Sequence, residues 1–168
     1  LNGEWQKVES LVSNLGPSMQ RGYDKAVSQF SRNLLAIVKK SLTLGIPPMG
    51  GGVTWQPLSP ATIERWGQHP IYNLTGLYSR SVGLYRYKSR VLIGLPIGTR
   101  RSSQKKLTLN QLAMMLEFGS SDGRIPPRPV WAPSLKAAGG KNKLKQLILT
   151  EIRKELQKYG VRPNQVKW

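Results

Sequence analysis

The sequence predicts an α+β fold in which a long N-terminal helix and a C-terminal helix pack on a small antiparallel β-sheet. Three observations predict it: a helical apolar pattern after residue 17, two short strand-like segments near the middle, and a second helical pattern near the end. With 168 residues, the chain is expected to form a single domain over 1–168, with extended arms at 1–16 and 161–168.

The two long helices are predicted from apolar periodicity and from their end signals. The first is expected to begin at Pro17 and to stop at Gly45, because proline suits a first-turn position and glycine a helix stop. Its apolar stripe comprises Met19, Tyr23, Val27, Phe30, Leu34, Ile37, Val38 and Leu42. The last helix is expected over about 133–159, interrupted at 139–140. Its apolar side comprises Leu144, Leu147, Ile148, Ile152 and Leu156.

A loop and a short helix are predicted after the first long helix. The segment 45–57 is rich in glycine and proline and is expected to be a loop. Ser59 is a candidate N-cap, and Pro60 suits the first position of the helix that follows. Residues 73–79 are expected to form another helical turn.

A hairpin and a third helix are predicted in the second half of the chain. The segments 82–87 and 90–95 are expected to be strands joined tightly around Lys88-Ser89. Thr108 is expected to cap a helix over 109–118, and Gly119 to end it in the left-handed conformation. The segment 125–133 is rich in proline and is expected to be extended.

The composition limits the classes of function. Twenty-six Lys and Arg residues against eight Asp and Glu give a net charge of +18, which attracts nucleic acid or acidic partners. The absence of cysteine excludes disulfides and thiolate metal sites. No apolar run approaches the ~18 residues that a membrane span requires. His69 is the single histidine, and no acidic residue is placed to orient it, so the sequence predicts a protein that is not an enzyme and has no cofactor.

Four short motifs carry the strongest signal, and all of them are architectural. They are Trp55-Gln56-Pro57-Leu58-Ser59-Pro60-Ala61-Thr62, Leu74-Thr75-Gly76-Leu77, Glu117-Phe118-Gly119, and Ile125-Pro126-Pro127-Arg128-Pro129-Val130-Trp131. Each motif alone fits an ordinary loop or helix end. Glu117 and Arg128 are expected to pair across the intervening turn. The candidate interface residues are Trp55, Pro57, Leu58, Gly76, Phe118, Gly119, Pro126, Arg128, Pro129 and Trp131.

The order and spacing of these motifs over about residues 17–160 resemble the tailed-phage virion morphogenesis, or tail-completion, family. The resemblance implies a structural virion protein at the head–tail junction, or neck, assembled in the host cytoplasm. It implies a homo-oligomeric ring, six-fold or a multiple of six, around the DNA channel. The expected partners are the head connector or adaptor, the tail terminator or tube proteins, and double-stranded DNA bound without sequence specificity. The resemblance implies no catalytic residues.

Basic clusters supply the candidate DNA contacts. The candidates are Arg86, Lys88, Arg100, Arg101, Lys105 and Lys106. In the hairpin, tyrosines alternate with basic residues, which resembles a surface for stacking and phosphate contact. Two other interpretations remain open: a solvated basic face, and pairing with acidic neighbours. The alternative function is a non-catalytic basic nucleic-acid-binding protein, associated with the ribosome or with packaging.

Overall fold

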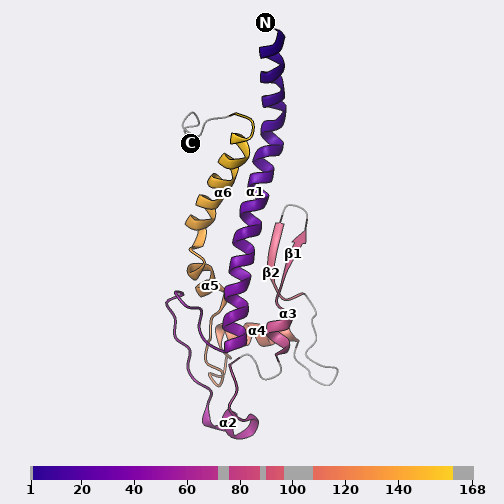
Figure 1. The fold of residues 1–168 in the computed structure, drawn as a ribbon. Coiled ribbons are helices and arrows are strands. Elements are labelled where there is room, and N and C mark those ends of the chain that lie inside the picture. The colour runs from indigo at the N-terminus through magenta and orange to yellow at the C-terminus, as the bar shows by residue number, and fades with distance from the viewer. Residues whose placement is uncertain (1, 72–75, 88–89, 97–107, 161–168) are drawn as a thin grey trace. The chain divides into compact units, whose positions relative to one another are not determined.

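Six helices and a two-stranded antiparallel sheet form the described part of the chain, which confirms the α+β class (Figure 1). This computed structural model describes residues 2–71, 76–87, 90–96 and 108–160. The helices are α1 (Asn2–Leu44), α2 (Pro60–Trp66), α3 (Leu77–Ser81), α4 (Leu109–Phe118), α5 (Trp131–Ala137) and α6 (Gly140–Gln157). The strands are β1 (Gly83–Tyr87) and β2 (Arg90–Gly94). No described helix is long and apolar enough to cross a membrane.

The chain divides into two compact units. The first contains α1 up to Phe30 together with the chain from Lys141 onward, and the second contains Ser31–Gly140. The arm predicted for 161–168 lies outside the described residues.

The helix α1 begins at Asn2, so the predicted start at Pro17 is wrong. Pro17 lies inside the helix instead. An interior proline lacks the N–H that would bond to the carbonyl four residues earlier, and it costs about 3 kcal/mol relative to alanine. A helix of 43 residues continues its hydrogen bonding on both sides of this single defect. The predicted stop is correct, since Gly45 follows the last helical residue with a φ of 66°.

In the first unit, small residues form the buried face of α1 up to Ala26, and Phe30 of the predicted stripe is buried further along. Ser18, Gly22 and Ala26, spaced four residues apart, are buried. Met19 and Tyr23, which the predicted stripe placed inside, are exposed. The reason is a close approach of two helices: a Cβ on Gly22 would lie 2.7 Å from the backbone N and Cα of Ile152 in α6. A helix surface at this distance must be made of small side chains.

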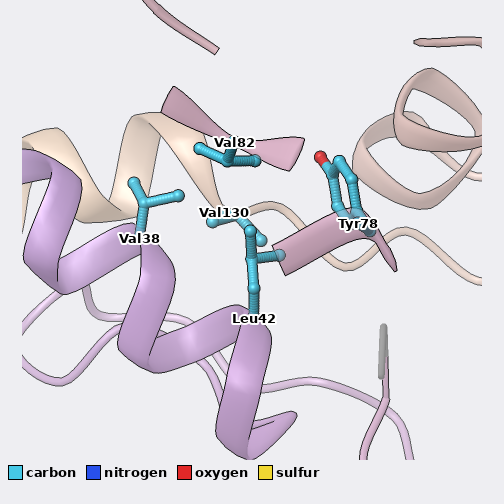
Figure 2. Packing of buried hydrophobic residues seen from close by; sticks show 5 residues of the cluster. All are labelled: Val38, Leu42, Tyr78, Val82 and Val130. Carbon is cyan, nitrogen blue, oxygen red and sulfur yellow. The ribbon is translucent and has the colours of Figure 1, made fainter. Parts of the chain in front are cut away.

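In the second unit, the apolar core joins α1 to three other segments. Val38 and Leu42 of α1 meet Tyr78 of α3, Val82 before β1, and Val130 before α5 (Figure 2). The partly buried side chains packed against this cluster are Leu34, Leu35, Trp55, Leu95, Ala113 and Trp131. The C-terminal part of the predicted α1 stripe is therefore confirmed at Val38 and Leu42.

The short helices begin where their capping residues predict. The hydroxyl of Ser59 accepts a hydrogen bond from the Thr62 N–H at the start of α2. Thr108 and Gln111 form a reciprocal capping box at the start of α4. The end of α4 differs from the prediction, because Gly119 has a φ of 83° and a ψ of 171°, which is not the left-handed helical conformation.

The C-terminal helical region is two helices. The predicted interruption at 139–140 is confirmed, since Gly139 lies between α5 and α6 and Gly140 begins α6, both with a positive φ. The predicted start near residue 133 is wrong, because α5 begins at Trp131. Pro133 occupies the first turn, where its missing N–H is not needed for the helix.

Candidate interaction site

The proline segment (residues 125–130) is tied to the loop before α2. The indole Nε1 of Trp55 donates a hydrogen bond to the carbonyl of Pro129 at 3.1 Å. The guanidinium of Arg128 donates from Nε to the carbonyl of Gln56 and from Nη2 to that of Pro57, both at 3.1 Å. Arg128 is only 5% exposed, so this charge lies in the interior and depends on these carbonyl partners.

The same segment is tied to the end of α4. The carboxylate of Glu117 accepts hydrogen bonds from the N–H of Val130 at 2.7 Å and of Trp131 at 3.2 Å. These N–H groups stand at the start of α5, where a helix leaves its first donors unsatisfied. The sequence predicted that Glu117 pairs with Arg128; in the structure, both side chains anchor the proline segment through main-chain atoms. We call Trp55, Glu117 and Arg128 the anchoring side chains.

Glycine is required where α4 meets the proline segment. A Cβ on Gly119 would lie 3.0 Å from the carbonyl oxygen of Ile125, and the φ of Gly119 is positive. Gly76 also has a positive φ, of 65°, at the N-cap of α3, where its carbonyl accepts from the Ser79 hydroxyl. Both glycines therefore serve the local backbone geometry.

A cleft of about 590 Å³ opens beside the proline segment. Its size lies within the range of ligand-binding pockets, and apolar side chains dominate its wall. These side chains include Leu58, Ile71, Leu77, Leu109, Leu112 and Leu116. The predicted interface residues Pro57, Pro126 and Arg128 also line it. The sequence did not predict the cleft, because its wall comes from segments up to 72 residues apart.

Polar residues also line the cleft, and two of them are arginines. Arg124 and Arg128 are the charged residues of its described wall, which contains no carboxylate. The Nδ1 of His69 lies 2.9 Å from the carbonyl of Pro70 and therefore carries the proton when the ring is neutral. Its Nε2 is then a buried acceptor that has no partner in the described structure. Burial raises the pKa of Tyr78 above its ordinary value, and the nearby Glu117 carboxylate adds to the effect.

This wall does not contain the groups of a hydrolytic site. A nucleophile needs an adjacent base that is itself held by a third group. His69, the one imidazole, has its Nδ1 on a carbonyl, and the cleft supplies no acid to it. Within the described residues, no three His, Cys, Asp or Glu side chains gather as a metal site would require.

The other side of α4 carries two exposed apolar residues. Phe118 is 75% exposed and Met114 is 63% exposed. They are four residues apart and therefore share one face of the helix. Phe118 belongs to the predicted interface set and is left mostly exposed by the fold, whereas Met114 was not singled out from the sequence.

The DNA-facing candidates lie largely outside the described residues. These are Lys88, Arg100, Arg101, Lys105 and Lys106. Arg86 is described, on β1, where it is exposed and pairs in register with Val91. Because side chains alternate along a strand, Arg86 and the two tyrosines of β1 occupy opposite faces. The tyrosine face instead carries Arg90, opposite Tyr87, and Leu92, opposite Tyr85.

In the first unit, a buried carboxylate meets three cations, a cluster that the sequence did not predict. Glu155 of α6 is 3% exposed, and its carboxylate lies 2.5 Å from Lys25 Nζ, 2.8 Å from Lys158 Nζ and 3.6 Å from Arg21 Nε. Hydrogen bonds from Lys158 and Lys25 lower the pKa of Glu155 to about 2. The spacing of Glu155 and Lys158 is a sequence signal for an ion pair, but the residues on α1 are 130 or more positions away.

No protein family, curated protein or solved structure matches this chain. The phage-family resemblance therefore rests on the quoted sequence motifs alone.

Proposed function

We propose that this chain is a structural protein of a tailed-phage virion, which forms a ring at the head–tail junction and joins the tail to the head connector around the DNA channel. The observation that supports this proposal best is the convergence of three motifs that are distant in sequence. Trp55, Glu117 and Arg128 hold one proline segment through five hydrogen bonds to main-chain atoms. Such an arrangement fixes the shape of the segment, as a structural role requires.

The electrostatics agree with a place next to a polyanion. A net charge of +18 on 168 residues disfavours self-association in free solution and favours binding beside DNA or acidic proteins. A channel that passes a genome needs no base readout, because phosphate attraction is independent of sequence.

In this proposal, the protein works by assembly. The anchored proline segment sets the angle at which the exposed surfaces are presented to neighbours, namely other copies, the connector or adaptor, and the tail terminator or tube proteins. The cleft and the exposed end of α4 are the described surfaces that such neighbours can use. Non-specific double-stranded DNA occupies the middle of the ring.

The test is electron microscopy of purified virions labelled with an antibody against this chain. We expect the label at the neck, between capsid and tail. Label that is absent from virions but found on ribosomes or bulk nucleic acid would overturn the proposal.

A free nucleic-acid-binding protein is the second candidate, and the hairpin favours it. Tyr85, Tyr87 and Arg90 are exposed on one face, which suits base stacking with phosphate contact. Alanine substitution of Arg100, Arg101, Lys105 and Lys106 separates the two candidates. A free binder should lose most of its DNA affinity and show a flatter salt dependence, whereas a connector should lose particle assembly or DNA retention. The matched control removes four charges elsewhere, at Lys136, Lys141, Lys143 and Lys145.

A further inference from the structure

We propose that Met114 and Phe118 of one copy of this chain insert into the cleft of a second copy, which makes a head-to-tail contact between neighbours. The inference rests on the proposed ring and names the contact that would build it. The occupant of the cleft is thus a second copy, and its inserting residues are the two exposed apolar residues of α4, which we call the α4 knob.

The geometry of α4 supports this contact. Successive helical residues are rotated by about 100°, so Phe118 lies about half a turn from Leu109 and Leu116 around the helix axis. Those two leucines line the cleft, while the α4 knob is exposed on the opposite face. One short helix therefore carries an apolar projection on one side and part of an apolar cavity on the other.

The cleft is large and apolar enough to accept the α4 knob. Its volume of about 590 Å³ exceeds the space that two side chains need, and most residues of its wall are apolar. Aromatic residues that fill such a pocket are the usual anchors of protein interfaces. Phe118 and Met114 are otherwise left in water by the fold, at 75% and 63% exposure.

The charges of the two surfaces are complementary. The charged residues of the described cleft wall are Arg124 and Arg128, both positive. Arg128 is buried against carbonyls, so Arg124 is the exposed cation of this wall. The carboxylate of Glu117 is bonded to the N–H groups of Val130 and Trp131. The negative pole of the helix dipole at the C-terminal end of α4, where Phe118 lies, is therefore the partner that the α4 knob brings to this cation.

The symmetry of the contact follows from the two faces. A projection and a cavity on opposite sides of one helix cannot satisfy each other across a two-fold axis. Each copy must therefore use its α4 knob on one neighbour and its cleft on the other. Such a heterologous contact closes into a ring when the rotation between copies divides a full turn.

The experiment uses cross-linking, which detects weak contacts, in the full-length chain. The chain has no cysteine, so single introduced thiols are unambiguous. One variant carries Gln56→Cys at the cleft, where Gln56 engages Arg128 through its carbonyl and not its side chain. The other carries Met114→Cys and keeps Phe118. The two are mixed with a bis-maleimide linker at about 0.5 M salt, where the Debye length of about 4 Å screens the repulsion between copies.

We expect a covalent heterodimer from this mixture. Adding Phe118→Ser to the Met114→Cys chain should reduce its yield about ten-fold or more, because an interface anchor is lost. The matched control replaces Met114→Cys by Leu92→Cys, an exposed apolar site on β2, and should give no heterodimer. The inference would be overturned if the heterodimer yield were no greater than in this control, or if Phe118→Ser left the yield unchanged. It would also be overturned if the cleft were occupied only by another virion protein.

This outcome is separate from the test of the proposed function. Antibody label at the neck without cross-linking would leave the neck role standing and exclude the α4 knob as the ring contact. Cross-linking without label at the neck would establish the head-to-tail contact in a protein of another role.

Discussion

At the scale of single residues, buried charged side chains and their bonding partners stabilise each unit of this chain. Arg128 is enclosed by the carbonyls of the 56–57 loop, and Glu155 by two cations of α1 and by Lys158, which follows α6. A buried charge is tolerated only when its partners are in place, so removing one side leaves an expensive unpaired group. Substituting either residue therefore tests what stabilises the unit that contains it.

Replacing Arg128 by alanine should destabilise the second unit by about 3 kcal/mol, because two charged hydrogen bonds are lost and two carbonyls are left without donors. The measurement is the free energy of urea unfolding. Arg124→Ala is the matched control, since Arg124 has a side chain 86% exposed and pairs with its neighbour Asp122. That control should change stability by no more than about 0.5 kcal/mol. Equal effects at both positions would contradict the anchoring role of Arg128.

The stability of the first unit should fall in acid because of Glu155. Its pKa in the folded chain is about 2, below the ordinary 4.5, so the folded state favours the charged form. This contribution is complete above about pH 4.5 and is lost as the pH falls towards about 2. Thermal unfolding across that range measures it. Glu155→Gln should flatten the dependence, apart from the part due to Asp122, whose pKa is also lowered.

Glu151→Gln is the control for this pH dependence. Glu151 lies on the same helix and pairs with Lys154 three residues away. The control should keep the acid transition of the parent chain. Loss of the transition in Glu151→Gln, or its full retention in Glu155→Gln, would show that the Glu155 cluster is not its source.

At the scale of elements, the sequence predicted the helix starts that are set by residues close by in the chain. The starts of α2 and α4 follow from Ser59 and Thr108, whose caps bond to N–H groups three residues away. The start of α5 could not be predicted in this way, because its N–H groups are capped by Glu117, 13 and 14 residues earlier. The anchoring of the proline segment could not be predicted either, because its partners are backbone carbonyls about 70 residues away. Every residue has a backbone carbonyl, so the sequence does not show which ones accept these hydrogen bonds.

The buried face of α1 also depends on residues that are distant in the sequence, and its prediction was limited for the same reason. Periodicity of large apolar residues predicted Met19 and Tyr23 as inward, but closeness to α6 selects small residues. Gly22→Ala should therefore destabilise the first unit by about 2 kcal/mol or more, despite a gain in helix propensity of about 1 kcal/mol. The measurement is chemical unfolding followed by circular dichroism.

Gly16→Ala is the matched control for Gly22→Ala. A Cβ at Gly16 would meet no atom within 4 Å. Its effect should stay within about 0.5 kcal/mol, because the propensity gain is offset by the steric restriction on a residue before proline. A stabilising Gly22→Ala substitution would contradict the close approach of α1 and α6.

At the scale of the whole molecule, net charge and apolar anchoring act against each other. If the proposed ring has six copies, their charges of +18 sum to a formal charge of +108. Repulsion of this size would oppose assembly at low ionic strength, whereas the proposed contact between the α4 knob and the cleft would favour it. The balance must therefore shift with salt and with any polyanion that enters the ring.

The purified chain should be monomeric at about 0.05 M salt, where charges interact over more than 10 Å, and should associate when salt or short double-stranded DNA is added. Sedimentation velocity at increasing salt, with and without DNA, gives the measurement. Phe118→Ser is the control, because it keeps the charge of +18 and removes the apolar anchor, so it should stay monomeric in high salt. A stable ring of the parent chain alone at low salt would contradict this balance, since repulsion would then be too weak to make assembly depend on a polyanion.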